Sequence, residues 1–473
     1  MTELTLLEAL RLSLFTMLPC LAGLLLGRVC LPIPNQPGVR ALHLGLALIF
    51  GPLLAAPSLH LVDWLGWPLS FMPALAGLLL ITTSTVFAAG LCARFMGPIP
   101  LMRPMAAGPP LVNPRTERWL LALLLGLIIL RLGSLLPDLL LRPVFPWDAW
   151  KTWAWKARTW FELGELIQFA PGREWLSAPA GMQVIDGVNH PDAVSLLMLW
   201  SAIALGRWDD SMLGIPWLLC GLGMGLALYG LLRLHGLPRA LALASVYVML
   251  SLPMLSTHIV LFGYADLWMA GLFTSLGVAL VLWLRLPDWR FLGLILLSMI
   301  TMALIKDTGS YWIPVILATL VARYIPTRWL AALAGIGILI GVILFVLGID
   351  PITLLTAERV RLDPRPMLDA ASGMGRHLFV WLDWHLLGWL LLPLVIAAGL
   401  SGKNSPEIRG LLVLVLLSLL ALALAFSLTR AAQYAIVGTL FSRMLLQVVP
   451  VIILLAGLVI WDWLRPPIRH PDE

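Results

Sequence analysis

Residues 145–161 read FPWDAWKTWAWKARTWF, and this stretch is the most informative part of the chain. It contains five tryptophans interleaved with Asp148, Lys151, Lys156 and Arg158. Indole rings favour the headgroup zone of a bilayer, where an apolar body and a polar N–H group are both satisfied. The stretch is therefore predicted to lie on a membrane surface, with an acidic residue placed where a hydrophobic span has just ended.

The composition of the whole chain predicts a polytopic α-helical membrane protein. Of its 473 residues, 60% are hydrophobic and 12% are charged, which excludes a soluble globular domain. The basic residues behind the net charge of +6 are scattered over short loops and do not indicate nucleic-acid binding. A Walker A motif is absent, which argues against direct coupling to ATP. The four cysteines fall in or beside apolar runs, so we expect small core residues rather than disulfides or metal ligands.

Apolar runs long enough to cross a bilayer, or nearly so, predict about 13 transmembrane helices. We expect three parts: extra transmembrane helices in 1–118, a membrane module in 119–348 that includes the loop 142–210, and a second loop with the last transmembrane helices in 349–473. The predicted spans are 5–26, 41–61, 67–92, 119–141, 211–232, 240–260, 267–286, 291–305, 309–324, 328–348, 384–400, 408–428 and 443–463.

One short apolar run decides the orientation. Residues 194–206 are too few for an ordinary crossing, so this run is expected to lie in the interface. The Lys and Arg residues of the short loops then gather on one side, as the positive-inside rule requires, whereas a spanning run removes that bias. The prediction is a cytoplasmic C-terminus, an exoplasmic N-terminus and two long exoplasmic loops, 142–210 and 349–383.

Within the first long loop, a helix that starts at residue 147 is predicted to be amphipathic and interfacial. Its aromatic and alanine side chains recur at three- and four-residue spacing on one face, and its charged side chains lie on another. The first face comprises Trp147, Trp150, Trp153, Ala154, Ala157, Trp160 and Phe161, and the second comprises Lys151, Arg158, Glu162 and Glu165. A second surface helix, with Trp200 and Trp208, is expected after His190.

The charged residues of this loop each have two interpretations. Asp148 falls in the first helical turn, where a carboxylate suits either the helix dipole or a chemical role. Lys151, Lys156 and Arg158 suit contacts with lipid headgroups, or phosphate binding by one of them. His190, taken alone, is more often structural.

Further ionisable residues sit where the chain turns at the bilayer. Asp266 begins an apolar run, and Lys306 and Asp307 lie between two such runs. A charge at the bilayer centre costs roughly 2.5–3.5 kcal/mol and less near the interface, so it is usually kept for a partner or a site. An ion pair between Lys306 and Asp307 across their turn is the simpler alternative. The remaining candidates for binding phosphate are Arg376, Arg430, Tyr434 and Arg443.

Four motifs, taken in order, resemble the GT-C superfamily of integral-membrane glycosyltransferases, which includes the lipid A aminoarabinose transferases and protein O-mannosyltransferases. All four fall on the predicted exoplasmic face. The resemblance covers about 119–325; the first three spans look like an N-terminal addition. The motifs are Trp-Asp-Ala-Trp at 147–150, Asn-His-Pro-Asp at 189–192, Gly-Tyr-Ala-Asp-Leu at 263–267 and Leu-Ile-Lys-Asp-Thr-Gly at 304–309.

The resemblance implies inverting transfer of a sugar from a polyprenyl-phosphate-linked donor to a lipid, glycan or protein acceptor. Asp148 would act as the base on the acceptor hydroxyl, and Asp266 matches the acid of the family's next exoplasmic turn. Lys306 matches a basic residue near the donor phosphate, where a fixed cation would stabilise the leaving group. The family often has a second acid beside the base, but Ala149 occupies that position here. We expect no cofactor and assign no metal ligands.

The implied location is a bacterial inner membrane, with the active site facing the periplasm. A transporter or flippase of polyprenyl-linked glycans is the alternative function, and it would need an internal repeat and polar residues at mid-membrane depth. A structural or assembly protein that has lost activity is a third possibility, because the second acid beside Asp148 is missing.

Overall fold

The computed structural model describes residues 4–96, 112–179, 181–325, 367–403 and 405–465. These residues form eight helices long and apolar enough to cross a membrane, or nine if one bent pair counts as a span. The protein is therefore a multi-pass α-helical membrane protein. The long helices are α1 (Leu6–Cys30), the joined α2 (Val39–Leu53) and α3 (Ala55–Trp64), α4 (Phe71–Met96), α5 (Pro114–Leu141), α8 (Ile215–Leu234), α11 (Asp266–Arg285), α18 (Pro406–Leu428) and α20 (Phe441–Leu464).

The number of about 13 spans remains a prediction. In place of the span expected at 240–260, α9 (Arg239–Ser251) and α10 (Pro253–Val260) meet at an angle of 66°. Pro253 accounts for the bend, because proline disfavours helical backbone at the residue before it. Three further helices are shorter than a full crossing: α12 (Trp289–Ile305), α13 (Trp312–Ala322) and α17 (Leu387–Ser401). The span predicted at 328–348 lies outside the described residues.

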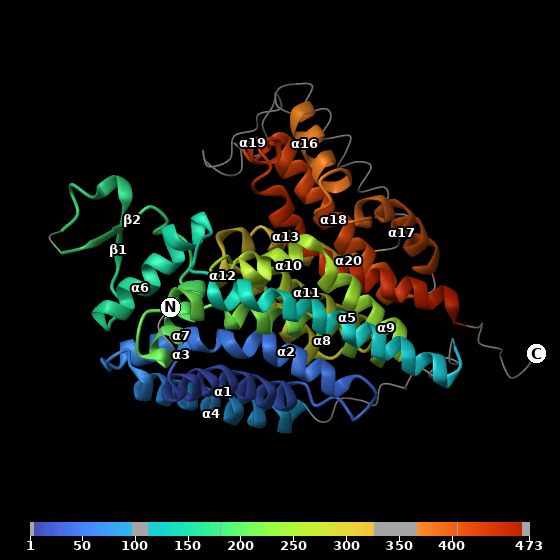
Figure 1. Ribbon diagram of the computed structural model, residues 1–473. Helices are drawn as coiled ribbons and strands as arrows, with labels where there is room; N and C mark the ends of the chain where they lie inside the picture. Colours follow the sequence, from blue (N-terminus) through green and yellow to red (C-terminus); the bar gives the residue numbers. More distant parts are fainter. Residues whose placement is uncertain (1–3, 97–111, 180, 326–366, 404, 466–473) are drawn as a thin grey trace, which may run out of the picture.

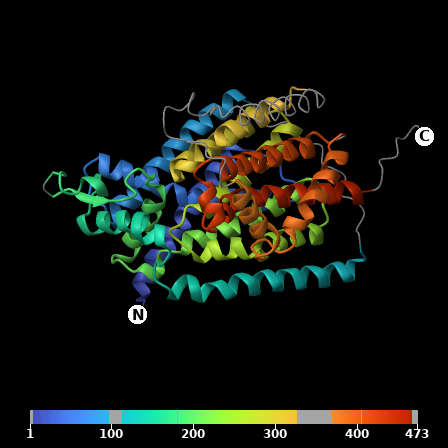
Figure 2. The ribbon, with the colours of Figure 1, turned by 90° about the horizontal axis from the view of Figure 1, so that it is seen from above.

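The long helices lie roughly side by side, and α1 begins at the end of the bundle opposite to the end of α20 (Figures 1 and 2). The N-terminal helices α1, α2 and α4 form one side of this bundle (Figure 1). α2 packs closely on α8, where a Cβ atom at Gly45 would overlap the backbone nitrogen of Ala227. Small residues allow membrane helices to approach in this way. The N-terminal helices are thus packed into the same body as the helices that follow.

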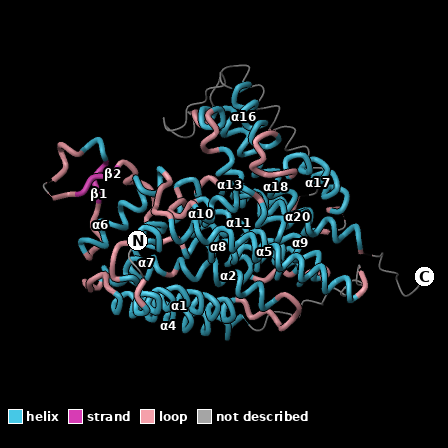
Figure 3. The backbone as a smooth tube through the Cα atoms, in the orientation of Figure 1, coloured by secondary structure: helices cyan, strands magenta, loops and turns pink. Residues whose placement is uncertain are grey.

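Part of the segment between α5 and α8 projects from one end of the bundle and carries a small sheet (Figure 3). Strands β1 (Phe169–Pro171) and β2 (Gln183–Ile185) pair in parallel, with Ala170 opposite Val184. The predicted all-α fold did not include this sheet, because strands of three residues show no detectable period. The other elements of the segment are the π-helix η1 (Ala149–Trp153), α6 (Ala154–Leu163), α7 (Ala193–Leu205) and the 3-10 helices η2 (Gly172–Glu174) and η3 (Asp210–Met212).

The single apolar face predicted for residues 147–161 is wrong. Trp147 and Trp150 are 62% and 45% exposed, whereas Trp153 and Trp160 are buried. The π-helix explains the difference, because its wider turn rotates the residues before it relative to those after it. Helical spacing of 3.6 residues therefore does not carry across Ala149–Trp153. Trp153 and Trp160 pack into the protein, while Trp155 between them stays 48% exposed.

The predicted second surface helix is also wrong. α7 has 13 residues, too few to cross a membrane, but all of them except the first are buried. The indole N–H of Trp200 donates to the carbonyl oxygen of Phe15 at 2.7 Å. α7 is apolar on every side, and a helix of this kind belongs in a core. α1, α3 and α6 pack against it.

The start of α20 is held by a group of short helices. α16 (Met367–Phe379) and α19 (Ala432–Ile436) pack on each other and on α18. The 3-10 helix η4 (Asp307–Gly309) links α12 to α13.

Candidate functional site

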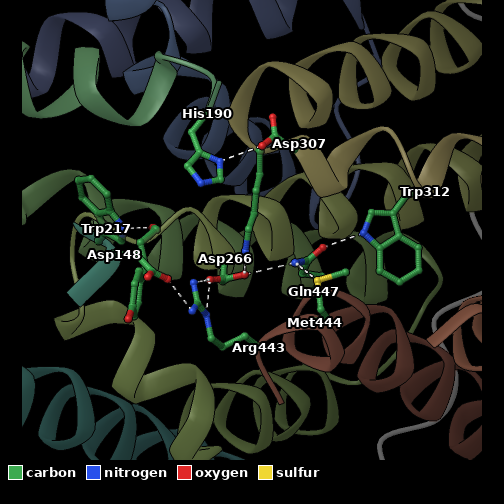
Figure 4. Close-up of polar contacts among 11 residues, drawn as sticks. Asp148, His190, Trp217, Asp266, Asp307, Trp312, Arg443, Met444 and Gln447 are labelled. Atoms are coloured by element: carbon green, nitrogen blue, oxygen red, sulfur yellow. Dashed lines mark hydrogen bonds and ion pairs between the residues drawn. The ribbon is translucent and has the colours of Figure 1, made fainter. Parts of the chain in front are cut away.

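Ionisable side chains from four separate segments meet where α5 and α12 end and where α11 and α20 begin, and Figure 4 shows their contacts. All four were predicted from the sequence as site residues, and their turns share one end of the bundle, as the predicted topology requires. We call them the charge cluster. They are Asp148 just before η1, Asp266 at the first position of α11, Lys306 just after α12, and Arg443 in the first turn of α20.

Arg443 joins the two carboxylates of the cluster. Its Nε and Nη2 donate to Oδ2 of Asp266 at 2.9 and 2.8 Å, and its Nη1 donates to Oδ2 of Asp148 at 2.9 Å. The guanidinium carbon also lies 4.1 Å from the centroid of the Tyr264 ring. Burial raises the pKa of the Tyr264 phenol, so a neutral ring faces the cation. These contacts fix the plane of the guanidinium.

Asp266 is the buried centre of the cluster, with no exposed surface. Its Oδ1 accepts from Nζ of Lys306 at 2.6 Å and from Nε2 of Gln447 at 3.4 Å. The Oε1 of Gln447 in turn accepts from the indole N–H of Trp312 at 2.7 Å. Buried charges are tolerated when they are paired and hydrogen-bonded in this way. The two carboxylates and two cations of the cluster cancel in formal charge.

Asp148 differs from Asp266 in its access to the outside. The side chain of Asp148 is 42% exposed, whereas that of Asp266 is 0% exposed. The Asp148 carboxylate does not cap the helix that follows it. A molecule arriving from outside can therefore reach Asp148, while Asp266 is accessible only through its neighbours.

No protein-family model, curated protein or solved structure matches this chain. Its function is therefore inferred from the chemistry of the site.

His190 is fixed from three sides. Its Nδ1 pairs with Oδ2 of Asp307 at 2.8 Å, its ring lies 5.4 Å from the Trp153 ring, and its carbonyl oxygen accepts from Nζ of Lys156 at 2.8 Å. Lys156 is buried and also pairs with Asp192 at 2.9 Å. The predicted headgroup contact of Lys156 is therefore wrong, because its ammonium group is buried against the His-Pro turn.

The sequence also left open an ion pair between Lys306 and Asp307. The structure instead directs the two side chains to different partners, since Lys306 pairs with Asp266 and Asp307 pairs with His190. His190 thereby comes next to the cluster through consecutive residues of one turn (Figure 4).

The other predicted binding residues are not brought to the charge cluster. Lys151 pairs with Asp186 at 2.7 Å, and Arg158 pairs with Glu162 at 2.8 Å on the exposed side of α6. Exposed ion pairs of this kind contribute little to stability. The remaining three are exposed and take no part in the hydrogen bonds of the cluster: Arg376, Arg430 and Tyr434.

Ser442, the residue before Arg443, anchors the start of α20 by hydrogen bonds. The Ser442 hydroxyl donates to Oδ2 of Asp383 at 2.6 Å and lies 2.8 Å from Nδ1 of His377, which pairs with the same carboxylate at 2.9 Å. Burial alone would raise the pKa of the Asp383 carboxyl, but its hydrogen bonds with His377 and Ser442 hold that pKa below its usual range. His377 and Asp383 of the second long loop therefore hold in place the first turn of α20, which carries Arg443.

An apolar groove of about 880 Å³ extends to Ile305, the residue before Lys306, and none of the four charged residues of the cluster lines it. It lies between α12 and the N-terminal helices α1, α2 and α4, and we call it the α12 groove. Along α12 the lining extends from Trp289 to Ile305, the residue before Lys306. The lining also includes Pro191, the residue after His190. Because α12 has 17 residues, the groove runs about 25 Å along that helix.

Two features of the site were missed at the sequence level. Gln447 lies one turn after Arg443 in an apolar span, and a polar residue at that depth is itself a signal of a site or a partner. Trp312 carries no such signal. Among the described residues, no group of three or more His, Cys, Asp or Glu side chains could hold a metal ion.

The position after Asp148 has no space for a second acid. Ala149 is fully buried, and a Cβ atom at Gly263 would lie 2.7 Å from its Cβ. Gly263 has a φ of +88°, which favours glycine. The second carboxylate near Asp148 comes instead from α11, through the bridge that Arg443 makes to Asp266.

Proposed function

We propose that this protein is a GT-C-type glycosyltransferase, which moves a sugar from a polyprenyl-phosphate-linked donor to a hydroxyl group of an acceptor at the membrane surface. The acceptor is a lipid, a glycan or a protein. Following the predicted topology, the site faces the periplasm of a bacterial inner membrane, in a bundle of about 13 spans.

One observation carries the proposal: the α12 groove and the charge cluster adjoin each other. Ile305 lines the groove, and the next residue, Lys306, belongs to the cluster. A groove for a long apolar chain that ends one residue before a paired cation suits a substrate with an apolar chain and a phosphate head. The four ordered motifs that resemble the GT-C superfamily contribute residues to this same region.

The proposed reaction assigns a distinct role to each charge. The acceptor oxygen attacks the anomeric carbon, and its proton passes to Asp148, which is exposed enough to meet the acceptor. The bond between that carbon and the phosphate oxygen breaks, and polyprenyl phosphate leaves. Lys306 and Arg443 would stabilise the negative charge on the leaving group. Asp266 positions both cations from its buried place and is not expected to touch the substrate.

The proposal is tested with the purified full-length protein in nanodiscs. Polyprenyl monophosphates that carry a neutral hexose, an amino sugar or a pentose are supplied together with an extract of envelope lipids, glycans and proteins. The expected result is release of free polyprenyl phosphate and a matching gain in mass of one acceptor fraction. If every donor remains intact while the protein stays folded, the proposal is wrong.

Filling the α12 groove is expected to weaken use of the donor. Gly293 lines the groove, and a Cβ atom there meets nothing within 4 Å, so Gly293→Phe should add bulk without a clash. We expect the KM for the donor to rise by about threefold to tenfold with kcat nearly unchanged, because the lost contacts are the same in the ground and transition states. The effect is modest because the polyprenyl chain of the donor also packs well among the membrane lipids.

The matched control for the groove is Gly126→Phe in α5. Gly126 is equally open around its Cβ but does not line the groove. Steady-state kinetics of both variants should show a change in the Gly293 variant alone. Equal behaviour of the two variants would mean that the groove does not hold the donor.

A flippase of polyprenyl-linked glycans is the second candidate, and two observations favour it. The groove follows the full length of α12, and the α9–α10 pair is bent by 66°, as in the broken helices of many transporters. Proteoliposomes loaded with a lipid-linked sugar separate the two functions. A flippase changes the leaflet in which the lipid resides but not its mass, whereas a transferase releases the lipid phosphate.

A further inference from the structure

We propose that Asp148 is the resting occupant of an anion site on Arg443, and that the phosphate of the lipid-linked substrate displaces it. This inference rests on the proposed function and concerns how the same site is regulated. The exchange is non-covalent: the ion pair between Arg443 and Asp148 breaks, and an ion pair between Arg443 and a phosphate oxygen forms. Asp148 is thereby freed only when the donor is in place.

The charge balance of the cluster is the first reason. Lys306 and Arg443 are the cations expected to meet a phosphate, yet both are already matched by Asp148 and Asp266. A phosphate that approached the intact cluster would add negative charge to a neutral, largely buried group. Binding is favourable only if one carboxylate gives up its place.

The burial of the two carboxylates decides which one leaves. Asp266 has no exposed surface and accepts hydrogen bonds from Lys306, Arg443 and Gln447. Asp148 is 42% exposed and makes its ion pair with Nη1 of Arg443. Moving Asp148 into solvent breaks one ion pair, whereas moving Asp266 would disrupt the cluster.

The orientation of Arg443 prepares it for the incoming anion. Asp266 holds Nε and Nη2, and the Tyr264 ring supports the guanidinium plane. Nη1 therefore keeps its direction when Asp148 moves away, and a planar guanidinium with a fixed N–H direction suits a phosphate oxygen. The same movement leaves Asp148 without its guanidinium partner, ready to take a proton from the acceptor hydroxyl.

The test measures binding of radiolabelled polyprenyl monophosphate, without a sugar, to the full-length protein in nanodiscs of a neutral lipid. Asp148→Asn removes the competing charge and should lower the apparent Kd by about threefold to tenfold, since a half-exposed ion pair no longer has to be broken. Asp186→Asn is the matched control, because Asp186 is also an exposed carboxylate of this segment but pairs with Lys151. Its Kd should equal that of the wild-type protein.

Each outcome distinguishes this inference from the proposed function. Equal or weaker binding by the Asp148→Asn variant overturns the displacement, while the proposed donor stands if the wild-type protein binds the probe. An equal gain in both variants reveals a general charge effect and also overturns it. If none of the proteins binds the probe, the proposed donor is wrong. Adding Arg443→Gln to Asp148→Asn should abolish the gain in a variant whose folding is verified by thermal unfolding.

Discussion

Replacing Asp266 with alanine is expected to destabilise the protein by about 3–5 kcal/mol, the usual range when one partner is removed from a buried ion pair. The side chain has no exposed surface, and it accepts from Lys306 and Arg443. Without it, two cations in a largely buried site share the half-exposed Asp148 as their remaining acidic partner in the cluster. The measurement is thermal unfolding of the full-length protein in detergent, read by retention of a single peak in size-exclusion chromatography.

The control for this change is Asp307→Asn, which alters a half-exposed acid in a neighbouring turn and should have a small effect. Combining Asp266→Leu with Lys306→Met should recover part of the lost stability, because an apolar pair removes the unpaired charge of Lys306. An Asp266→Ala variant as stable as the wild-type protein would mean that the buried network does not hold these helix ends together.

Replacing Asp148 with asparagine is expected to lower the rate of sugar transfer by about 10²- to 10⁴-fold, the range of a lost general base. The side chain keeps its shape but can no longer take the proton of the acceptor hydroxyl. Because Asp148 is 42% exposed and belongs to no helix cap, the variant should fold and reach the membrane like the wild-type protein. The measurement is donor turnover at saturating donor, normalised to folded protein.

The useful control for Asp148→Asn is again Asp186→Asn, which should keep full turnover because Asp186 pairs with Lys151 away from the cluster. Together with the binding measurement, Asp148→Asn should combine tighter binding of polyprenyl phosphate with slow transfer. Turnover near the wild-type rate would remove Asp148 from the role of base, whatever its effect on binding.

The helical membrane fold and the four residues of the charge cluster could be predicted from the sequence because both have clear local signals. A charge beside an apolar run stands out, and the alternation of spans places the ends of successive turns on one side. Asp148, Asp266, Lys306 and Arg443 could be found in this way. Their pairing could not, because the choice of Asp266 rather than Asp307 as the partner of Lys306 depends on how α11 and α12 pack.

The errors in the first long loop have two physical causes. The π-helix at Ala149–Trp153 changes the residue spacing without any strong signal in composition, so the predicted face was lost after one turn. The burial of α7 and of Lys156 depends on neighbours that are distant in the sequence. Trp200, for example, finds its hydrogen-bond acceptor at Phe15. Their aromatic and basic residues therefore led to a predicted surface location, although α7 and Lys156 are buried inside the protein.

The π-helix also divides the four tryptophans of the predicted apolar face into two pairs under different constraints. Trp153 and Trp160 are interior residues, and their replacement would leave cavities. Trp147 and Trp150 flank Asp148, contact each other edge to face at 5.0 Å and remain largely outside. Substitution of Trp147 or Trp150 is therefore expected to have little effect on the stability of the fold. The proposed function predicts that the outer pair tolerates substitution, whereas replacement of the inner pair lowers stability.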